Sequence, residues 1–172
     1  SDHPYNALLD LYEEGSTVAD LDILFKDAAL RLKPLIQKVI EKQAKPTQFL
    51  KQHFDKYIQM NLVSDILNFL QIDATKYRID LSSHPFCTHF HPTDIRITTR
   101  INEKDLMSSI WSAIHEAGHA TYEMGLNYIH FGMPSCEAVS LGIHESQSRF
   151  WENNIARSLE FIEAIFPLLL RH

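Results

Sequence analysis

The sequence predicts a mainly α-helical protein. Glycine is scarce, with five residues in 172, and apolar residues recur with the 3.6-residue period of a helix through most of the chain. Residues 76–101 differ, because they combine β-branched residues and two prolines with a period-two alternation. We therefore expect one domain of residues 1–172, with a helical part (1–75), a small β region (76–101) and a second helical part (102–172).

Two helices are expected first. A proline and a glycine mark the two ends of a short helix within residues 4–15. Thr17 and Asp20 then form a capping pair, in which side-chain oxygens accept hydrogen bonds from free backbone N–H groups, and residues 18–43 follow as a longer helix. Pro34 lacks a backbone donor, so we expect it to kink or split that helix.

The middle of the chain should change from helix to strand. Residues 47–72 have the apolar pattern of one or two further helices. The segment DIRITTRI, residues 94–101, alternates between apolar and polar side chains and predicts a strand, and residues 77–81 predict another.

Two more helices complete the expected fold. Asn102 can cap a helix of residues 103–124, which ends at Gly125. After a loop, Ser135 can cap a last long helix over residues 136–165.

Composition excludes several classes of function. The net charge is −6 and the sixteen lysines and arginines are dispersed, which argues against a nucleic-acid or anionic-membrane surface. Neither a run of eighteen apolar residues nor a secretory signal is present, so no membrane span is expected. Cys87 and Cys136 lie far apart in the sequence and indicate free thiols in a reducing cytoplasm.

The segment SAIHEAGHATYEMG, residues 112–125, contains a candidate metal site. His115 and His119 are four residues apart, so on a helix both imidazoles extend from one face. Two such ligands, each about 2.0–2.1 Å from zinc, form half of a tetrahedral site. Glu116 is rotated by roughly 100° around the helix, where it can contact a metal-bound water rather than the metal. On this motif alone, an ordinary helix with two histidines stays an alternative.

A catalytic zinc site needs a third protein ligand. Glu145, in GIHESQSRFWEN, follows His119 by 26 residues and lies on the next predicted helix. Two helices joined by a short loop can pack antiparallel, which would bring Glu145 opposite the histidine pair. Gly118 lowers helix propensity by about 1 kcal/mol, and we expect another backbone or the metal site to approach closely there.

These segments, together with HPF (84–86) and DIRIT (94–98), resemble the M32 metallocarboxypeptidases, the family of the thermostable carboxypeptidases. The four motifs occur in order over residues 84–151, and the resemblance covers nearly the whole chain. It implies a helical zinc-peptidase fold with a small β-sheet beside the active-site groove. It also implies that the intact enzyme is a homodimer.

The resemblance also assigns roles to residues. It makes His115, His119 and Glu145 the metal ligands and Glu116 the catalytic glutamate, which activates a zinc-bound water. One Zn²⁺ per chain is expected, although cobalt or another divalent metal could occupy such a site. The implied activity is removal of C-terminal residues from peptides, and the substrates are peptides with a free C-terminus.

Four other residues are candidates for contacting the substrate or supporting a metal ligand: His84, Asp94, Arg96 and His144. For Asp94 and Arg96, which share one face of the expected strand, a buried ion pair that supports the sheet is the alternative. Glu123, four residues after His119, is a candidate acceptor for an imidazole N–H, although a solvated charge is the simpler interpretation.

Two further motifs of the family, which lie downstream in its longer members, do not occur here. We therefore expect a middle section of such an enzyme, with the metal-binding part, an incomplete substrate groove and low activity. Two alternatives stay open. One is another zinc peptidase with the same motif and distal glutamate, acting as an endopeptidase or aminopeptidase. The other is a non-catalytic helical module for metal binding or assembly.

Overall fold

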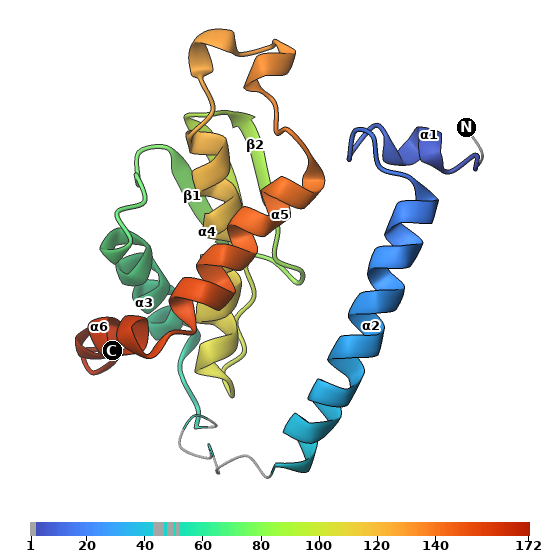
Figure 1. Ribbon diagram of the computed structural model, residues 1–172. Helices are drawn as coiled ribbons and strands as arrows, with labels where there is room; N and C mark the ends of the chain where they lie inside the picture. The colour runs from blue at the N-terminus through green and yellow to red at the C-terminus, as the bar shows by residue number, and fades with distance from the viewer. Residues whose placement is uncertain (1–2, 43–46, 48–49, 51) are drawn as a thin grey trace. The chain divides into compact units, whose positions relative to one another are not determined.

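The computed structural model describes residues 3–42, 47, 50 and 52–172 (Figure 1). Contacts divide the chain into two compact units, Ser1–Thr47 and Gln48–His172, each of which is described by itself. That the two form one domain stays a prediction. Residue 43, at the expected end of the first long helix, and most of residues 47–51 lie outside the described part.

The described part of the first unit contains two helices, α1 (Asn6–Leu9) and α2 (Val18–Glu41). The predicted cap is confirmed, because the Thr17 side chain accepts a hydrogen bond from the backbone N–H of Asp20. The backbone N–H of Val18 donates to the side chain of Asn6 at 2.9 Å, which ties the start of α2 to α1. The expected split at Pro34 is wrong, because α2 continues through this residue. Only one backbone donor is lost there, and the turns on both sides remain bonded.

The second unit begins with α3 (Lys56–Phe69), whose first N–H groups donate to Asp55. A three-stranded sheet follows, of β1 (Tyr77–Leu81), β2 (Cys87–His91) and β3 (Asp94–Thr99). Its order is β1-β3-β2, with β1 parallel and β2 antiparallel to the central β3. The predictions of β1 and β3 are confirmed, whereas β2 was not predicted.

Two helices carry most of the candidate site, and their predicted caps are wrong. Helix α4 (Leu106–Met124) is capped by Asp105, which accepts from the N–H of Ser108. Asn102 instead accepts from the N–H of Lys104 in the preceding turn. Helix α5 (Leu141–Arg149) is capped by Ser140.

Ser135 does not cap a long helix, because it lies in one of two short 3₁₀ turns, η2 (Tyr128–His130) and η3 (Pro134–Cys136). The expected helix over residues 136–165 is therefore shorter and interrupted. After α5 comes a π-helical segment, η4 (Phe150–Ala156), and Ser158 then caps a separate helix, α6 (Leu159–Leu169). The helical class with a small sheet is confirmed.

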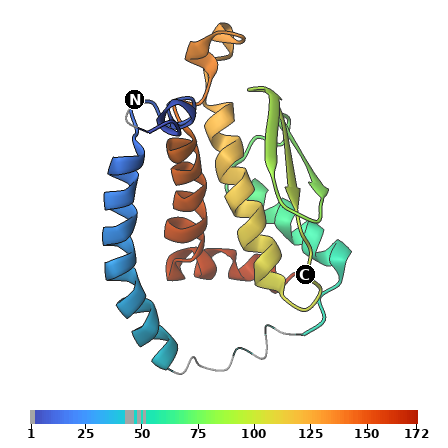
Figure 2. The same ribbon diagram turned by 90° about the vertical axis from the view of Figure 1, so that its right-hand side faces the viewer.

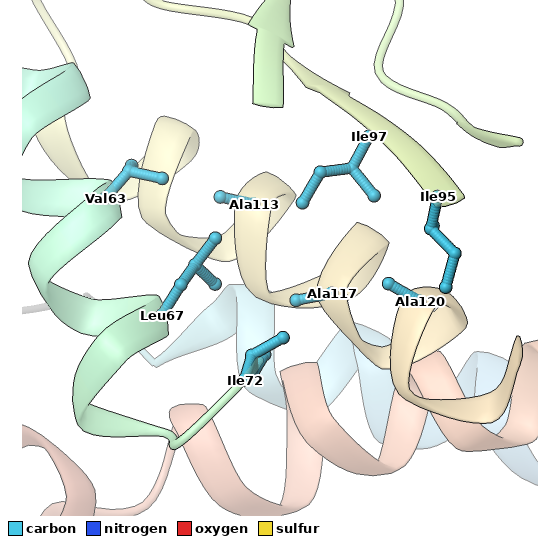
Figure 3. Close-up of a cluster of buried hydrophobic side chains, with 8 residues drawn as sticks. All are labelled: Val63, Leu67, Ile72, Ile95, Ile97, Ala113, Ala117 and Ala120. Atoms are coloured by element: carbon cyan, nitrogen blue, oxygen red, sulfur yellow. The ribbon is translucent and has the colours of Figure 1, made fainter. Parts of the chain in front are cut away.

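Helix α4 forms the middle layer of the second unit, with the sheet on one side and α5 on the other (Figures 1 and 2). On the sheet side, alanines of α4 meet isoleucines of β3 and apolar residues of α3 and its C-terminal turn (Figure 3). All of these side chains are buried. The cluster comprises Val63, Leu67, Ile72, Ile95, Ile97, Ala113, Ala117 and Ala120. Burial of each isoleucine contributes roughly 1.5–3 kcal/mol, so this cluster holds α4 firmly against the sheet.

The other face of α4 lies against α5, and Gly118 determines how close the two helices come. A Cβ atom added to Gly118 would lie 2.6 Å from Cα of Ser148, a backbone atom that cannot move aside without moving α5. The expectation that another backbone approaches Gly118 is confirmed. None of the helices in the described part of the chain combines the length and hydropathy that a bilayer-crossing segment needs.

Candidate metal centre and active site

The structure brings His115, His119 and Glu145 together. One helical turn separates the two histidines on α4, and Glu145 comes from the middle of α5, which crosses α4. Oε2 of Glu145 lies 3.6 Å from Nε2 of His115 and 3.2 Å from Nε2 of His119. The three donor atoms all lie within 4.8 Å of one another, and no other such group occurs among the residues that the structure describes.

These residues fit a divalent metal ion. Two imidazole nitrogens and one carboxylate oxygen are a common ligand set for zinc. Ligands about 2.0–2.1 Å from a tetrahedral zinc ion stand about 3.4 Å apart, and the two histidine–glutamate distances of 3.6 and 3.2 Å lie on either side of this value. With three protein donors, a fourth position is left for water or substrate.

The charge states also suit metal binding. Burial, together with the nearby His144 and His115, lowers the pKa of His119 to about 4, so its imidazole is neutral at neutral pH. Burial acts to raise the pKa of Glu145, but a hydrogen bond from Arg149 and the charges of His115, Arg149 and His119 outweigh it and lower that pKa. A neutral imidazole and an ionised carboxylate are the forms that bind metals.

Glu116 is buried beside this cluster, with 7% of its surface exposed. Burial, reinforced by the negative charge of Glu145, raises the pKa of its carboxyl group to about 7. A carboxylate with a pKa near the working pH can both accept and return a proton. A pocket of about 370 Å³ opens here, and its wall includes Glu116, His115 and His84.

His115 is held by a carboxylate that sequence reasoning missed. Its Nδ1 lies 3.0 Å from Oε2 of Glu152, in the π-helical segment, while its Nε2 faces Glu145. Arg157 and Arg149 donate to Glu152 at 2.6 and 3.2 Å. Glu152 follows Glu145 by seven residues, two helical turns, and that spacing was the signal that could have found it.

A second carboxylate lies behind His119. Nδ1 of His119 is 2.7 Å from Nδ1 of His144, and Nε2 of His144 is 2.7 Å from Oε1 of Glu123. Glu123 is 3% exposed, so the interpretation as a solvated charge is wrong. Nδ1 of His89, on the unpredicted strand β2, lies 3.3 Å from the other oxygen of Glu123.

The structure does not bring Asp94 and Arg96 to this cluster. Ile95 and Ile97 point toward α4, so Asp94 and Arg96 lie on the opposite face of β3. There they pair with each other at 2.6 Å, and both side chains are more than 40% exposed. The pair is therefore not buried. Of the other candidates, His84 lines the pocket beside His115.

The helical fold and the convergent His–His–Glu set with an adjacent buried glutamate define a class, the metallopeptidases with an HExxH helix and a distal glutamate ligand. Comparison with known proteins gives the family. The sequence model of the carboxypeptidase Taq (M32) metallopeptidases matches residues 1–172. The chain belongs to this family, which confirms the resemblance noted in the sequence.

Individual relatives agree with this result. Thermostable carboxypeptidase 1 of Pyrococcus furiosus is 43% identical over 171 residues, 98% of this chain and 34% of that protein. Carboxypeptidase 1 of Bacillus subtilis is 42% identical over 161 residues, 93% of this chain and 32% of that protein. The crystal structure of the M32 carboxypeptidase from Deinococcus radiodurans R1 matches with a TM-score of 0.92 at 36% identity, over 97% of this chain and 34% of that one. The chain thus spans about a third of the length of these relatives.

Proposed function

We propose that this chain carries the metal centre of a zinc-dependent carboxypeptidase, which hydrolyses C-terminal residues from peptides. The observation that carries the proposal is the convergence of His115, His119 and Glu145 next to a buried carboxyl group, Glu116. Membership of the M32 family supports a divalent metal and peptide hydrolysis. Zinc is proposed from the two imidazoles and one carboxylate, and cobalt could replace it.

In the proposed reaction the protein supplies a general base, a position for the attacking water and a pocket that binds the substrate. A divalent metal held by the three ligands would contribute Lewis acidity, polarising the scissile carbonyl and acidifying the attacking water. Glu116 accepts the proton of this water and then passes it to the leaving amine. The pKa of about 7 suits this double role, because the group is readily deprotonated and reprotonated near neutral pH. His84 and Trp111 line the pocket beside Glu116, which supports the proposal that they contact the substrate.

The cellular setting is also proposed rather than established. Cys87 and Cys136 are both free thiols, as in proteins of a reducing cytoplasm. Peptides with a free C-terminus are the proposed substrates, and assembly of the intact enzyme as a homodimer stays a prediction from the family resemblance.

A comparison of two substrates tests the activity. A zinc-loaded sample is assayed by mass spectrometry on one peptide with a free C-terminus and on the same peptide C-terminally amidated. We expect stepwise loss of C-terminal residues from the free peptide only. Glu116→Gln should lower the rate by about 10²–10⁴-fold, the usual contribution of general acid–base catalysis. Asp65→Asn is the control and should leave the rate unchanged, because Asp65 lies on α3 and does not line the pocket.

Each other outcome has a definite meaning. Equal cleavage of both peptides would contradict carboxypeptidase action and favour an endopeptidase. Cleavage that survives Glu116→Gln would contradict the assigned base. A metal-loaded protein that cleaves neither peptide would favour the non-catalytic metal-binding module.

A further inference from the structure

We propose that Glu123 and His144 form a relay that orients the metal ligand His119, with Glu123 acting only through His144. The inference rests on the proposed metal site and adds two positioning residues to it. Oε1 of Glu123 lies 2.7 Å from Nε2 of His144, and Nδ1 of the same imidazole lies 2.7 Å from Nδ1 of His119. These contacts link the C-terminal half of α4 to the N-terminal half of α5.

One set of proton positions satisfies every step. Nε2 of His119 faces Glu145 and is the atom that would bind the metal, so a neutral His119 carries its proton on Nδ1. This N–H donates to Nδ1 of His144, which must be unprotonated to accept it. His144 then carries its own proton on Nε2 and donates to Glu123. The carboxylate therefore selects the tautomer of His144, and His144 selects that of His119.

The surroundings hold the relay in place. The ring planes of His119 and His144 differ by only 17°, and their centroids are 4.5 Å apart. The ring of Tyr122 packs on His144 with centroids 5.0 Å apart. Glu123 is 3% exposed, and Nδ1 of His89 lies 3.3 Å from its second oxygen. Oε2 of Glu123 is buried without a hydrogen-bond partner among the residues that the structure describes. Release of His144 would therefore also cost this buried carboxylate its hydrogen bond at Oε1.

The two metal-binding histidines are thus supported differently. Glu152 contacts His115 directly, whereas Glu123 reaches His119 through an intervening imidazole. A ligand imidazole with a fixed hydrogen-bond partner binds a metal more tightly, because its orientation and tautomer are set before the metal arrives. Loss of the relay should therefore weaken metal binding, even though neither relay residue contacts the metal.

The test measures metal affinity instead of turnover. Zinc and cobalt dissociation constants are determined for the wild-type chain, Glu123→Gln, His144→Phe and the double variant, with the visible spectrum of bound cobalt as a report on ligand geometry. Circular dichroism establishes that each variant is folded. Asp65→Asn is the matched control, because Asp65 accepts a hydrogen bond from His172 at 2.9 Å, a histidine–carboxylate pair of the same chemistry.

We expect His144→Phe to weaken metal binding by roughly 10–100-fold and to change the cobalt spectrum, with Glu123→Gln changing both in the same direction by less. The double variant should bind like His144→Phe alone, because Glu123 has no other route to His119. Asp65→Asn should match the wild type. If His144→Phe does not fold, the affinity and cobalt spectrum of Glu123→Gln decide the matter.

Affinities of Glu123→Gln and His144→Phe equal to that of the wild type would overturn the relay and leave the metal site intact. Losses that multiply in the double variant would also overturn it, because Glu123 would then act independently of His144. A wild-type chain that binds neither metal would overturn the proposed metal site itself, and the relay with it.

Discussion

Glu116 lies where burial and a neighbouring negative charge act in the same direction. Both disfavour its ionised form, and together they raise its pKa from the ordinary 4.5 to about 7. The folded chain therefore binds a proton that the unfolded chain has already released between pH 4.5 and 7. Over that window, this residue makes the folded state less stable as the pH rises.

A difference measurement isolates this effect in metal-free buffer. Glutamine resembles the protonated glutamate, so Glu116→Gln should match the wild type below about pH 4.5 and exceed its stability above pH 7. The expected gain is about 1–2 kcal/mol, after solvent screening is allowed for. Urea unfolding with chelator present, at pH 4.5 and pH 8, measures it.

The wild type must be compared with Glu116→Gln at each pH, because His119 changes stability with pH in the opposite direction. Its pKa is lowered to about 4, so its contribution to stability increases as the pH rises. Both proteins contain His119, and its contribution largely cancels. A stability difference that stays constant between the two pH values would contradict the elevated pKa of Glu116.

At the scale of elements, the site depends on the crossing of α4 and α5. His115 and His119 come from one helix and Glu145 from the other, so any change in the separation of the helices changes the distances among the proposed metal ligands. Gly118 lies at the closest approach, with Ser148 as its neighbour.

Gly118→Ala should separate the two helices. Alanine favours the helix by about 1 kcal/mol, but the clash of its Cβ with the Ser148 backbone at 2.6 Å should outweigh this gain. We expect a net loss of about 1–3 kcal/mol of unfolding free energy, together with weaker zinc binding. Thermal unfolding and zinc titration measure the two effects.

Gly125→Ala is the control, because it makes the same substitution at the end of the same helix. Its φ of −79° suits alanine, and the nearest atom to an added Cβ is 3.3 Å away. We expect little change in either quantity. If Gly118→Ala and Gly125→Ala behaved alike, the helix separation would not be set at Gly118.

The elements also show what could be predicted from the sequence. Strand β3 was found because Ile95 and Ile97 alternate with polar residues. Strand β2 was missed because its partly buried positions carry Cys87, His89 and His91, not aliphatic residues. Ser135 and Ser140 are both suitable caps, and local sequence does not reveal that 3₁₀ turns fill the loop between α4 and α5.

Similar reasons apply to the candidate site. The spacing of His115 and His119 predicts one helix face from geometry alone, and the following motif pointed to Glu145. Glu152 lay within the expected last helix, two turns after Glu145, but no motif marked it as a partner of His115. His89 belongs to strand β2, whose sequence pattern did not predict a strand. Asp94 and Arg96 share a strand face as expected, but the strand's orientation against α4, which tertiary packing decides, turns that face away from the cluster.

At the scale of the whole molecule, we expect the chain to assemble one metal centre. The cluster of three donors lies entirely within the unit Gln48–His172. A buried core holds α4 against the sheet, and α5 packs closely on α4 at Gly118. The ligands should therefore be arranged before the metal binds, and the folded chain should hold the metal without help from another protein.

The most direct test is the metal content of the purified chain, measured by elemental analysis after dialysis against zinc and then against metal-free buffer. We expect about one zinc ion per chain, retained in Asp65→Asn and lost in His115→Ala, with all three proteins folded by circular dichroism. A folded wild-type chain that retains no zinc, or a His115→Ala variant that retains as much as the wild type, would contradict this expectation.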